Sequence, residues 1–248
     1  MRSYGYIRDA RDDRDHKLTL AAPGGELLVP DAHDLTAMFP PVMDQGQFGT
    51  CTAHGVTAAI RYNLINSDRG DVPLSRAQLY WDSGVIEGNT SDVGRQIRDV
   101  IKAIATKGAA REELWGYDKV GLQPPPELYA DAIKHEALEY CRIVNAAGEI
   151  DRASINTAIF VGHPVIIGIP VYKAFESDEV AETGIVPMPG ALETEIGMHC
   201  MLMGGYDLQH DRVMNSWSAS WGQAGYCSLP RGYLEKYGSD FWTILADN

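Results

Sequence analysis

Three reactive side-chain types follow one another in a set order along this sequence: a thiol, an imidazole and a carboxamide. Cys51 ends a glycine-rich run, His199 comes 148 residues later, and Asn215 follows after a further 16. A thiol attacks an acyl carbon only as the thiolate, and an imidazole can take its proton and later pass it to a leaving amine. An asparagine oxygen can hold that imidazole without adding charge. These residues therefore predict acyl transfer through a thioester on Cys51.

The residues around Cys51 supply the parts that such a nucleophile needs. Gln45 precedes the thiol by six residues and offers a side-chain amide to an oxyanion, with the backbone N–H of Cys51 as the second donor. Gly46 and Gly49 allow the intervening loop to turn tightly. Apolar residues then recur at near-helical spacing as far as Leu64, which predicts a buried helix whose N-terminus carries the thiol.

Three runs around these residues resemble the papain-like (C1) family of cysteine peptidases. They are DQGQFGTC at 44–51, GMHC at 197–200 and NSWSASWG at 215–222, and similarity extends over about residues 34–245. Cys51 alone would be weak evidence, because a lone cysteine on an apolar helix is usually a small buried hydrophobe. The resemblance therefore rests on the agreement of the three runs. It implies an α+β, two-lobe fold. A helical lobe with the Cys51 helix would pack against an antiparallel β-barrel-like lobe, with the active-site cleft between them.

Departures from the family pattern indicate which branch the chain resembles. Family members usually have a cysteine where Phe48 stands, paired to a second one in a loop that corresponds here to 91–94 and contains no cysteine. Met198 stands where many relatives carry aspartate. No catalytic atom is lost, and the missing cystine favours a prokaryotic or phage-type member.

The resemblance also implies a set of site residues. The catalytic ones are Gln45, Cys51, His199 and Asn215, and the substrate-binding ones are Gly94, Gly168, Met198, Cys200, Trp217 and Ser239. Trp217 would cover the His–Asn hydrogen bond. The pocket for the residue two positions before the cut would have Cys200 and Met198 in its wall, Gly168 opposite and Ser239 near its floor, with no charge at its base and a preference for large apolar side chains. His54 is interpreted as structural, because no residue downstream is evident to orient it as a base.

Composition along the chain predicts three parts. Residues 1–33 form an N-terminal extension, 34–130 a helical lobe and 131–248 a β-barrel-like lobe whose C-terminus returns to the interface; the prolines at 124–126 mark the break. The extension is too short for a folded prodomain, but it could lie along the cleft as a pro-like intramolecular ligand. Tyr4, Tyr6 and Ile7 would anchor it, and its Arg/Asp run at 8–15 would pair with charges at the lobe edges. A segment on the back of a lobe, or a mobile tail, is the alternative.

Charge and cysteine content exclude several classes of protein. The net charge of −13 disfavours nucleic-acid binding, and no apolar run approaches the roughly 18 residues of a membrane span. With Cys51 as nucleophile, three cysteines remain without a CxxC motif, which argues against a zinc site or a disulfide framework. A Cys141–Cys227 pair stays open. We expect no cofactor, no membrane partner, and a reducing, cytoplasmic location, since no signal peptide is visible.

The favoured function is therefore a cysteine-type endopeptidase that acts on peptides or proteins. No histidine-rich occluding loop that would restrict cleavage to chain ends is recognisable. Non-proteolytic acyl transfer or isopeptide cleavage at the same site is one alternative. A non-catalytic binding protein with this fold is another, but it would be expected to have lost a Cys, His or Gln, and all are present.

Overall fold

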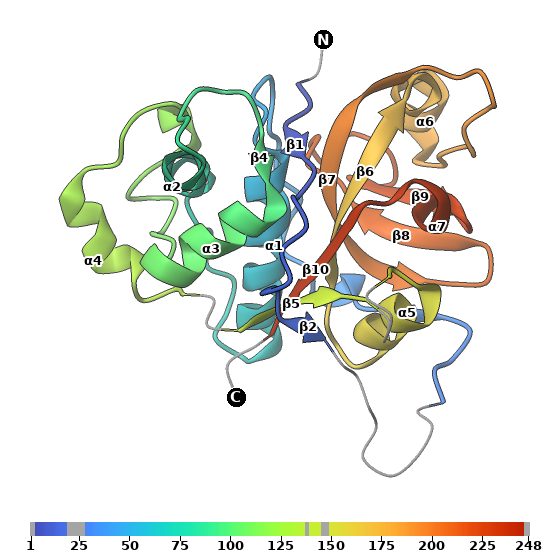
Figure 1. Cartoon of the computed structure of the whole chain (residues 1–248), viewed down its shortest axis with the longest axis horizontal. Coiled ribbons are helices and arrows are strands. Elements are labelled where there is room, and N and C mark those ends of the chain that lie inside the picture. The colour runs from blue at the N-terminus through green and yellow to red at the C-terminus, as the bar shows by residue number, and fades with distance from the viewer. Residues whose placement is uncertain (1–2, 19–27, 137–138, 145–148, 246–248) are drawn as a thin grey trace.

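The computed structural model folds into two lobes that lie side by side, one mainly helical and one built on a sheet (Figure 1). It describes residues 3–18, 28–136, 139–144 and 149–245. The helical lobe contains α1 (Cys51–Asn66), α2 (Arg76–Glu87), β4 (Arg95–Gln96), α3 (Ile97–Lys107), η2 (Tyr117–Lys119), η3 (Pro126–Leu128) and α4 (Tyr129–Ala132). The sheet lobe contains β3 (His33–Asp34), η1 (Thr36–Met38), β5 (Tyr140–Ile143), α5 (Arg152–Phe160), β6 (Val165–Tyr172), η4 (Lys173–Glu176), α6 (Asp178–Thr183), β7 (Glu195–Tyr206), β8 (His210–Met214), β9 (Tyr226–Pro230), α7 (Tyr233–Tyr237) and β10 (Asp240–Ile244).

The sheet aligns residues that are far apart in the sequence. With β2 (Lys17–Leu18) at its edge, its strand order is β2-β5-β10-β6-β7-β8-β9, and β3 also pairs with β7. Neighbouring strands are antiparallel except β2 and β5, which are parallel. β6 is an almost continuous apolar run and is buried nearly throughout, as expected for a strand covered on both faces. Its register sets Gly168 opposite Cys200 of β7 and Asp240 of β10.

Local signals set the ends of the helices around α1. The Ser75 side chain caps α2 by accepting a hydrogen bond from the Gln78 N–H, and the helix ends at Gly88 in the left-handed conformation with φ 74°. α3 buries one stripe of residues at helical spacing, Ile97, Val100, Ile101 and Ile104. α1 is instead buried on almost every side, because it contacts α2, α3, β6 and β7. Both lobes therefore hold the helix that begins at Cys51.

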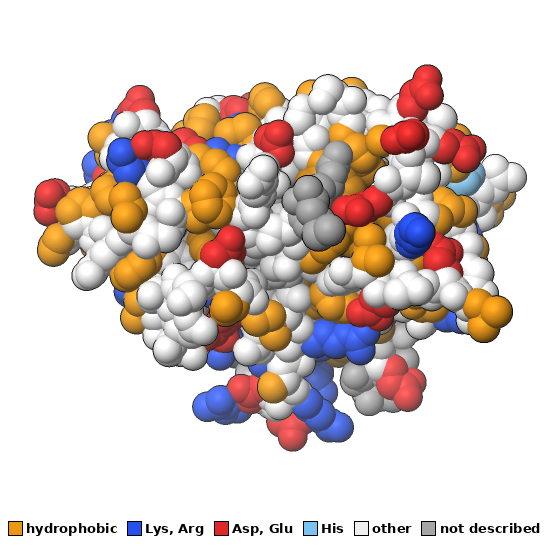
Figure 2. Space-filling view, turned by 90° about the horizontal axis from the view of Figure 1, so that it is seen from above, with side chains coloured by type: hydrophobic (Ala, Val, Ile, Leu, Met, Phe, Trp, Pro, Cys, Tyr) orange, Lys and Arg blue, Asp and Glu red, His pale blue; other side chains and the backbone are white. Residues whose placement is uncertain are grey.

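Two hydrophobic clusters form the interior. One joins the three main helices to residues of β6, β7 and β10, including the fully buried Trp242, and so makes the contact between the lobes. The other lies inside the sheet lobe beneath α5, α6 and α7. Among the described helices, none combines the length and apolarity needed to span a bilayer. Acidic side chains are scattered over the face seen in Figure 2, with hydrophobic ones exposed between them.

The fold agrees with the predicted α+β, two-lobe class and differs from the sequence analysis in details. The residue pattern also predicts strands at 142–146, 165–171, 200–206, 212–216, 225–230 and 241–245. The last five occur as β6, β7, β8, β9 and β10 within two residues of these bounds, apart from the earlier start of β7. Part of the strand expected at 142–146 lies outside the described residues. The short helices α5, α6 and α7 were not expected. Residues 34–39, predicted in the helical lobe, pack on the sheet lobe through the pairing of β3 with β7.

Residues 3–18, here called the strap, run between the lobes. β1 (Tyr6–Ile7) pairs in parallel with β4 of the helical lobe. Ten residues further on, β2 pairs in parallel with β5 of the sheet lobe. The strap is therefore attached by backbone hydrogen bonds to one lobe and then to the other, and its path crosses the predicted site.

Candidate active site

The sheet lobe supplies a histidine and an asparagine on neighbouring strands. His199 lies on β7 and Asn215 directly follows β8, its antiparallel neighbour. Asn215 Oδ1 lies 2.8 Å from His199 Nε2 and also accepts a 2.8 Å hydrogen bond from the Ser216 N–H. Because this oxygen only accepts, Nε2 carries a proton. Proton exchange with a thiol would therefore use Nδ1.

Aromatic rings surround this pair. The Trp217 ring stacks on His199 with centroids 4.9 Å apart and planes 27° apart, and is itself packed against Trp221. His199 has no exposed surface and Trp217 is buried. A hydrogen bond shielded from water in this way holds the imidazole more firmly than an exposed one would.

The helical lobe supplies the thiol as the first residue of α1. The backbone N–H groups of Cys200 and Gly5 face its sulfur, so Cys51 lies beside the residue that follows His199. Burial raises the pKa of the Cys51 thiol to about 11. By itself, the helix N-terminus would lower this pKa, because it favours a thiolate. The difference arises because the thiol is completely buried with the strap in place, which disfavours the charged form.

Gln45 is held in an orientation that directs its amide nitrogen toward the Ser3 carbonyl of the strap and the Phe48 carbonyl of its own loop. Its Oε1 accepts a 2.6 Å hydrogen bond from Ser216 Oγ, and its Nε2 donates to the carbonyl oxygens of Ser3 and Phe48 at 3.0 and 2.9 Å. The Gln45 N–H also donates to the Ser216 carbonyl at 2.9 Å. Gln45 therefore already binds a peptide carbonyl. Ser216 was missed by the sequence analysis, and its place next to Asn215 was the only available signal.

A carboxylate connects the two segments that a cystine joins in the resembled family. The Gly49 N–H donates to both oxygens of Asp92 at 3.0 and 3.2 Å, and Tyr80 Oη donates to the same carboxylate at 2.7 Å. Asp92 lies in the 91–94 loop, and Gly49 directly follows Phe48. Hydrogen bonds thus tie down the loop that precedes the nucleophile.

The strap occupies the cleft at the catalytic residues. The Tyr4 ring meets His199 and Trp217 edge-on, with centroids 6.0 and 6.2 Å away. Gly5 passes between Gly49 and Gly94, and a Cβ at Gly5 would collide with the Gly49 carbonyl oxygen. Gly94 has φ 90°, which favours glycine, and a Cβ there would press on the Gly5 carbonyl. The closeness of these backbones requires glycine on both sides.

Tyr6 fills the pocket predicted for a substrate side chain. Its ring lies where a Cβ of Gly168 would stand, and its hydroxyl is 2.8 Å from Ser239 Oγ and donates to Asp240 Oδ2. Cys200 faces Gly168 across the sheet, and the half-buried Met198 packs against the same cluster. The expectation of an uncharged base was wrong, because the Asp240 carboxylate lies there. Tyr4 and Tyr6 anchor the strap as expected, whereas Ile7 is 40% exposed and does not.

Other candidate sites are not formed in the described part of the chain. No group of three His, Cys, Asp or Glu residues there could hold a metal ion. All four cysteines are free, including Cys141 and Cys227, whose pairing the sequence left open. His54 is buried in hydrogen bonds with Thr50 and Arg76, which agrees with a structural role.

Comparisons with known proteins converge on one family. Residues 29–240 match the model of the papain family of cysteine proteases. An uncharacterised peptidase C1-like protein of Acanthamoeba polyphaga mimivirus is 33% identical over 98% of this chain and 86% of its own length. Xylellain, a cysteine protease from Xylella fastidiosa, superposes with a TM-score of 0.86 and 30% identity, over 100% of this chain and 97% of that one. Digestive procathepsin L 3 of the Tenebrio molitor larval midgut has a TM-score of 0.75 at 18% identity, over 98% and 76% of the two chains.

Proposed function

Because the chain belongs to the papain family of cysteine proteases, we propose that it cleaves internal peptide bonds of protein or peptide substrates through a thioester on Cys51. The observation that carries this proposal is the hydrogen bond from Gln45 Nε2 to a peptide carbonyl, beside a histidine held by Asn215. The site thus already contains a peptide group in contact with its oxyanion donor.

Each catalytic group has one task in this reaction. The Cys51 sulfur attacks the carbonyl carbon as the thiol proton passes to His199 Nδ1, and Gln45 Nε2 and the Cys51 N–H bind the oxyanion. The imidazolium then gives its proton to the leaving amine as the C–N bond breaks, which leaves an acyl thioester. His199 next takes a proton from water as the water oxygen attacks the thioester. The C–S bond then breaks, the acid is released, and the imidazolium returns its proton to the sulfur.

A peptide blocked at both ends, with a fluorophore and a quencher on either side of the cut, tests this activity. Only cleavage of an internal bond separates the two groups, and mass spectrometry of the products locates it. Cleavage restricted to peptides with a free end would contradict endopeptidase action. Transfer of the acyl group to an added amine in preference to water would favour the transamidation alternative.

We infer further that the strap is an intramolecular ligand of the cleft that limits access of substrate. In a substrate, the residue in the Tyr6 pocket would come before the residue whose carbonyl oxygen binds Gln45. In the strap, Ser3 supplies that carbonyl, and Tyr6 comes after Ser3. The strap therefore runs in the opposite direction to a substrate. This direction supports stable occupancy, because a reversed peptide does not present its bonds to Cys51 as a substrate does.

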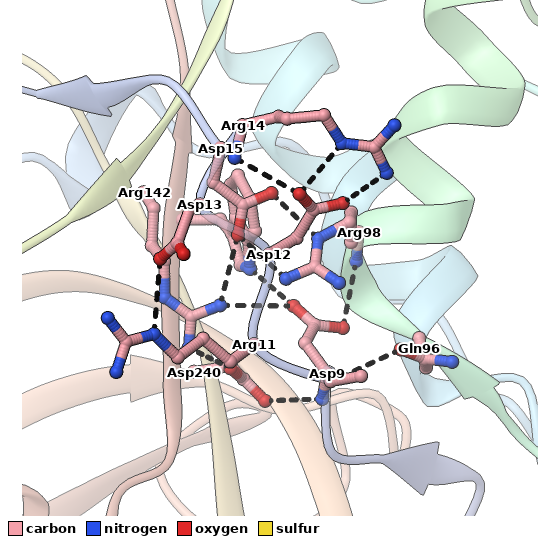
Figure 3. Close-up of polar contacts among 12 residues, drawn as sticks. Asp9, Arg11, Asp12, Asp13, Arg14, Asp15, Gln96, Arg98, Arg142 and Asp240 are labelled. Atoms are coloured by element: carbon pink, nitrogen blue, oxygen red, sulfur yellow. Dashed lines mark hydrogen bonds and ion pairs between the residues drawn. The ribbon is translucent and has the colours of Figure 1, made fainter.

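Charged residues hold the strap beyond the Tyr6 pocket, as Figure 3 shows. Asp15 accepts two hydrogen bonds from the Arg98 guanidinium of α3 at 2.8 and 2.7 Å. Arg142 of β5 lies 3.5 Å from Asp15 and 3.8 Å from Asp9, and it also pairs with Asp240. The Arg98 side chain is 5% exposed and that of Asp9 is fully buried. One arginine comes from each lobe, so these pairs, here called the latch, support occupancy of the cleft by joining the strap to both walls.

The occupied pocket also supports a substrate preference. We propose that a large aromatic side chain is favoured two positions before the cut, since Tyr6 fits against Gly168 and reaches Asp240. A positional peptide library tests this, and a preference for small or acidic residues there would overturn it. The free state of all four cysteines supports, as a further proposal, the reducing cytoplasmic location expected from the sequence.

A further inference from the structure

Behind the oxyanion donors, one hydroxyl group contacts both segments that carry them. Tyr117 Oη donates to the Gln45 backbone carbonyl at 2.8 Å and lies 2.6 Å from Thr50 Oγ1. Gln45 supplies the side-chain donor, and Thr50 is the N-cap of α1, immediately before the Cys51 N–H. The sequence places these two donors six residues apart on a glycine-containing loop. The Tyr117 hydroxyl joins the start of that loop to its end.

Three neighbouring side chains hold the Tyr117 ring. The Arg76 guanidinium lies over the ring face at 4.5 Å from its centroid. The His54 and Phe48 rings meet it edge-on, at centroid distances of 5.3 and 6.0 Å. A cation over one face and two rings packed perpendicular to the phenol limit both its sliding and its rotation. These three side chains, here called the support, therefore fix the position of the Tyr117 hydroxyl.

The polar members of this support are joined by hydrogen bonds. Arg76 is 5% exposed, pairs with Glu112, and donates to His54 Nε2 at 2.9 Å. His54 Nδ1 lies 3.0 Å from the Thr50 carbonyl, so Nδ1 is the protonated nitrogen and Nε2 the acceptor. Burial, with the Arg76 charge as a second cause, lowers the pKa of His54 to about 3, which keeps the ring neutral. A buried polar network in which each member has its partners specifies one arrangement of the backbone.

We propose that Tyr117 is a positioning residue for the oxyanion hole, and that its hydroxyl fixes the distance between the Gln45 amide and the Cys51 N–H. The inference rests on the proposed function, because it assigns an oxyanion to this site. It goes beyond that function by adding a residue that touches neither the substrate nor the reacting atoms. His54, Arg76 and Glu112 then act through Tyr117 rather than on the thiol.

The variant that isolates this role is Tyr117→Phe, which keeps the ring and its packing and removes only the hydroxyl. We expect kcat to fall about tenfold, less than the 10²–10³ typical of losing an oxyanion donor itself, with KM changed by less than about twofold. Thr50→Val removes the other half of the same contact and should change kcat in the same direction. Tyr62→Phe is the matched control, because its hydroxyl donates to the Gly162 carbonyl on another side of α1.

A purely structural role is distinguished by comparing two reactions of the same thiol. A peptide aldehyde forms a hemithioacetal that places an oxyanion in the hole, whereas alkylation by iodoacetamide forms no oxyanion. All variants are made in the full-length chain with Tyr6→Ala, so that the strap does not mask the cleft. For Tyr117→Phe we expect aldehyde affinity to fall about as much as kcat, with an unchanged alkylation rate.

The possible results separate the hypotheses. Equal aldehyde affinity and kcat in the Tyr117→Phe and Tyr62→Phe chains would overturn the positioning role while leaving peptidase activity in place. A parallel fall in aldehyde affinity and alkylation rate would also overturn it, because the thiol rather than the oxyanion hole would then be disturbed. A Tyr6→Ala chain that alkylates at Cys51 but neither cleaves peptides nor binds the aldehyde would remove the proposed function together with the inference.

Discussion

The catalytic wall of the cleft and the strap that lies against it are held by different kinds of interaction. His199, Asn215 and Gln45 are fixed by hydrogen bonds with amide and hydroxyl groups and by ring stacking. The strap is fixed beyond Tyr6 by carboxylates and guanidinium groups, chiefly Asp15 with Arg98. The second arrangement depends on the ionisation of its members and is screened by salt.

With these two kinds of interaction, one cleft can combine rigidly placed catalytic residues with a covering segment that can dissociate. Rigid placement of the proton-transfer groups preserves attack geometry, and the covering segment adds burial that opposes thiolate formation. If the comparison is correct, substitutions in the wall should abolish turnover, whereas substitutions in the latch should increase it.

The largest effect is expected in the wall. Cys51→Ala and His199→Ala should each reduce turnover of a fluorogenic peptide by about 10⁴-fold or more, because members of such a unit fail together. Asn215→Ala should leave a small remainder, since it only orients the imidazole. Purified Cys51→Ala protein with wild-type turnover would exclude the mechanism.

Removing the strap should have the next largest effect, in the opposite direction. A chain that begins at Asp31 should show a kcat/KM at least about tenfold higher, because a tethered ligand acts at roughly millimolar effective concentration. The pKa of Cys51 should fall as its burial is relieved. Circular dichroism and melting curves establish that both proteins are folded, and equal kcat/KM values for the two would remove the inhibitory role.

A smaller increase is expected from opening the latch within the full chain. Arg98→Gln leaves Asp15 without its two-point partner, and we expect peptide hydrolysis to rise about threefold, because a buried carboxylate that loses one of its two cations favours release. Arg14→Gln is the matched control, since Arg14 is exposed and pairs with Asp12 of the strap itself. The same gain in both variants would mean that strap charge in general, and not the latch, sets the activity.

The smallest effect should appear in the pH dependence of inhibition. Burial, followed by the Asp240 charge, raises the pKa of Asp9 to about 7 in the occupied cleft, while a released strap would titrate near the ordinary value. The occupied state therefore holds the extra proton, and its advantage declines as pH rises from about 4 through 7. The charged residues around Asp9 are Asp240, Asp15, Arg98 and Arg142. A substitution of Asp9 itself separates its titration from theirs.

The measured quantity is the kcat/KM of the full chain divided by that of the strap-free chain. Titration of the catalytic groups affects both values and therefore cancels in this ratio. It should increase between pH 5 and 8. Asp9→Asn, which mimics the protonated carboxyl group, should make the ratio independent of pH. A ratio that decreases with pH in the unmodified chain would contradict the assigned direction.

The catalytic residues and the fold class could be predicted because each depends on a residue type that others cannot replace. A thiol, an imidazole and a carboxamide in this order are the groups that the proposed chemistry uses, and the apolar spacing after Cys51 indicates the helix that carries the thiol. The strap residues Tyr4 and Tyr6 could be proposed as anchors because large aromatic side chains gain most from burial.

The remaining features depend on contacts between distant segments. The Asp240 charge at the Tyr6 pocket follows from the pairing of β10 with β6, and the Asp92 contact with Gly49 from the packing of two loops. Neither contact can be predicted from the local sequence pattern. The placement of residues 34–39 was wrong for the same reason, because β3 joins a strand more than 160 residues away in the sequence.

Labelling by a thiol-directed epoxysuccinyl peptide tests most directly the central claim that Cys51 is the nucleophile of a covered cleft. The probe is applied to the full-length chain and to the chain that begins at Asp31, and the modified residue is mapped by mass spectrometry. We predict modification of Cys51 alone among the four cysteines, at a slower rate in the full-length chain. Labelling at Cys141 with none at Cys51, in two proteins shown to be folded, would contradict the account.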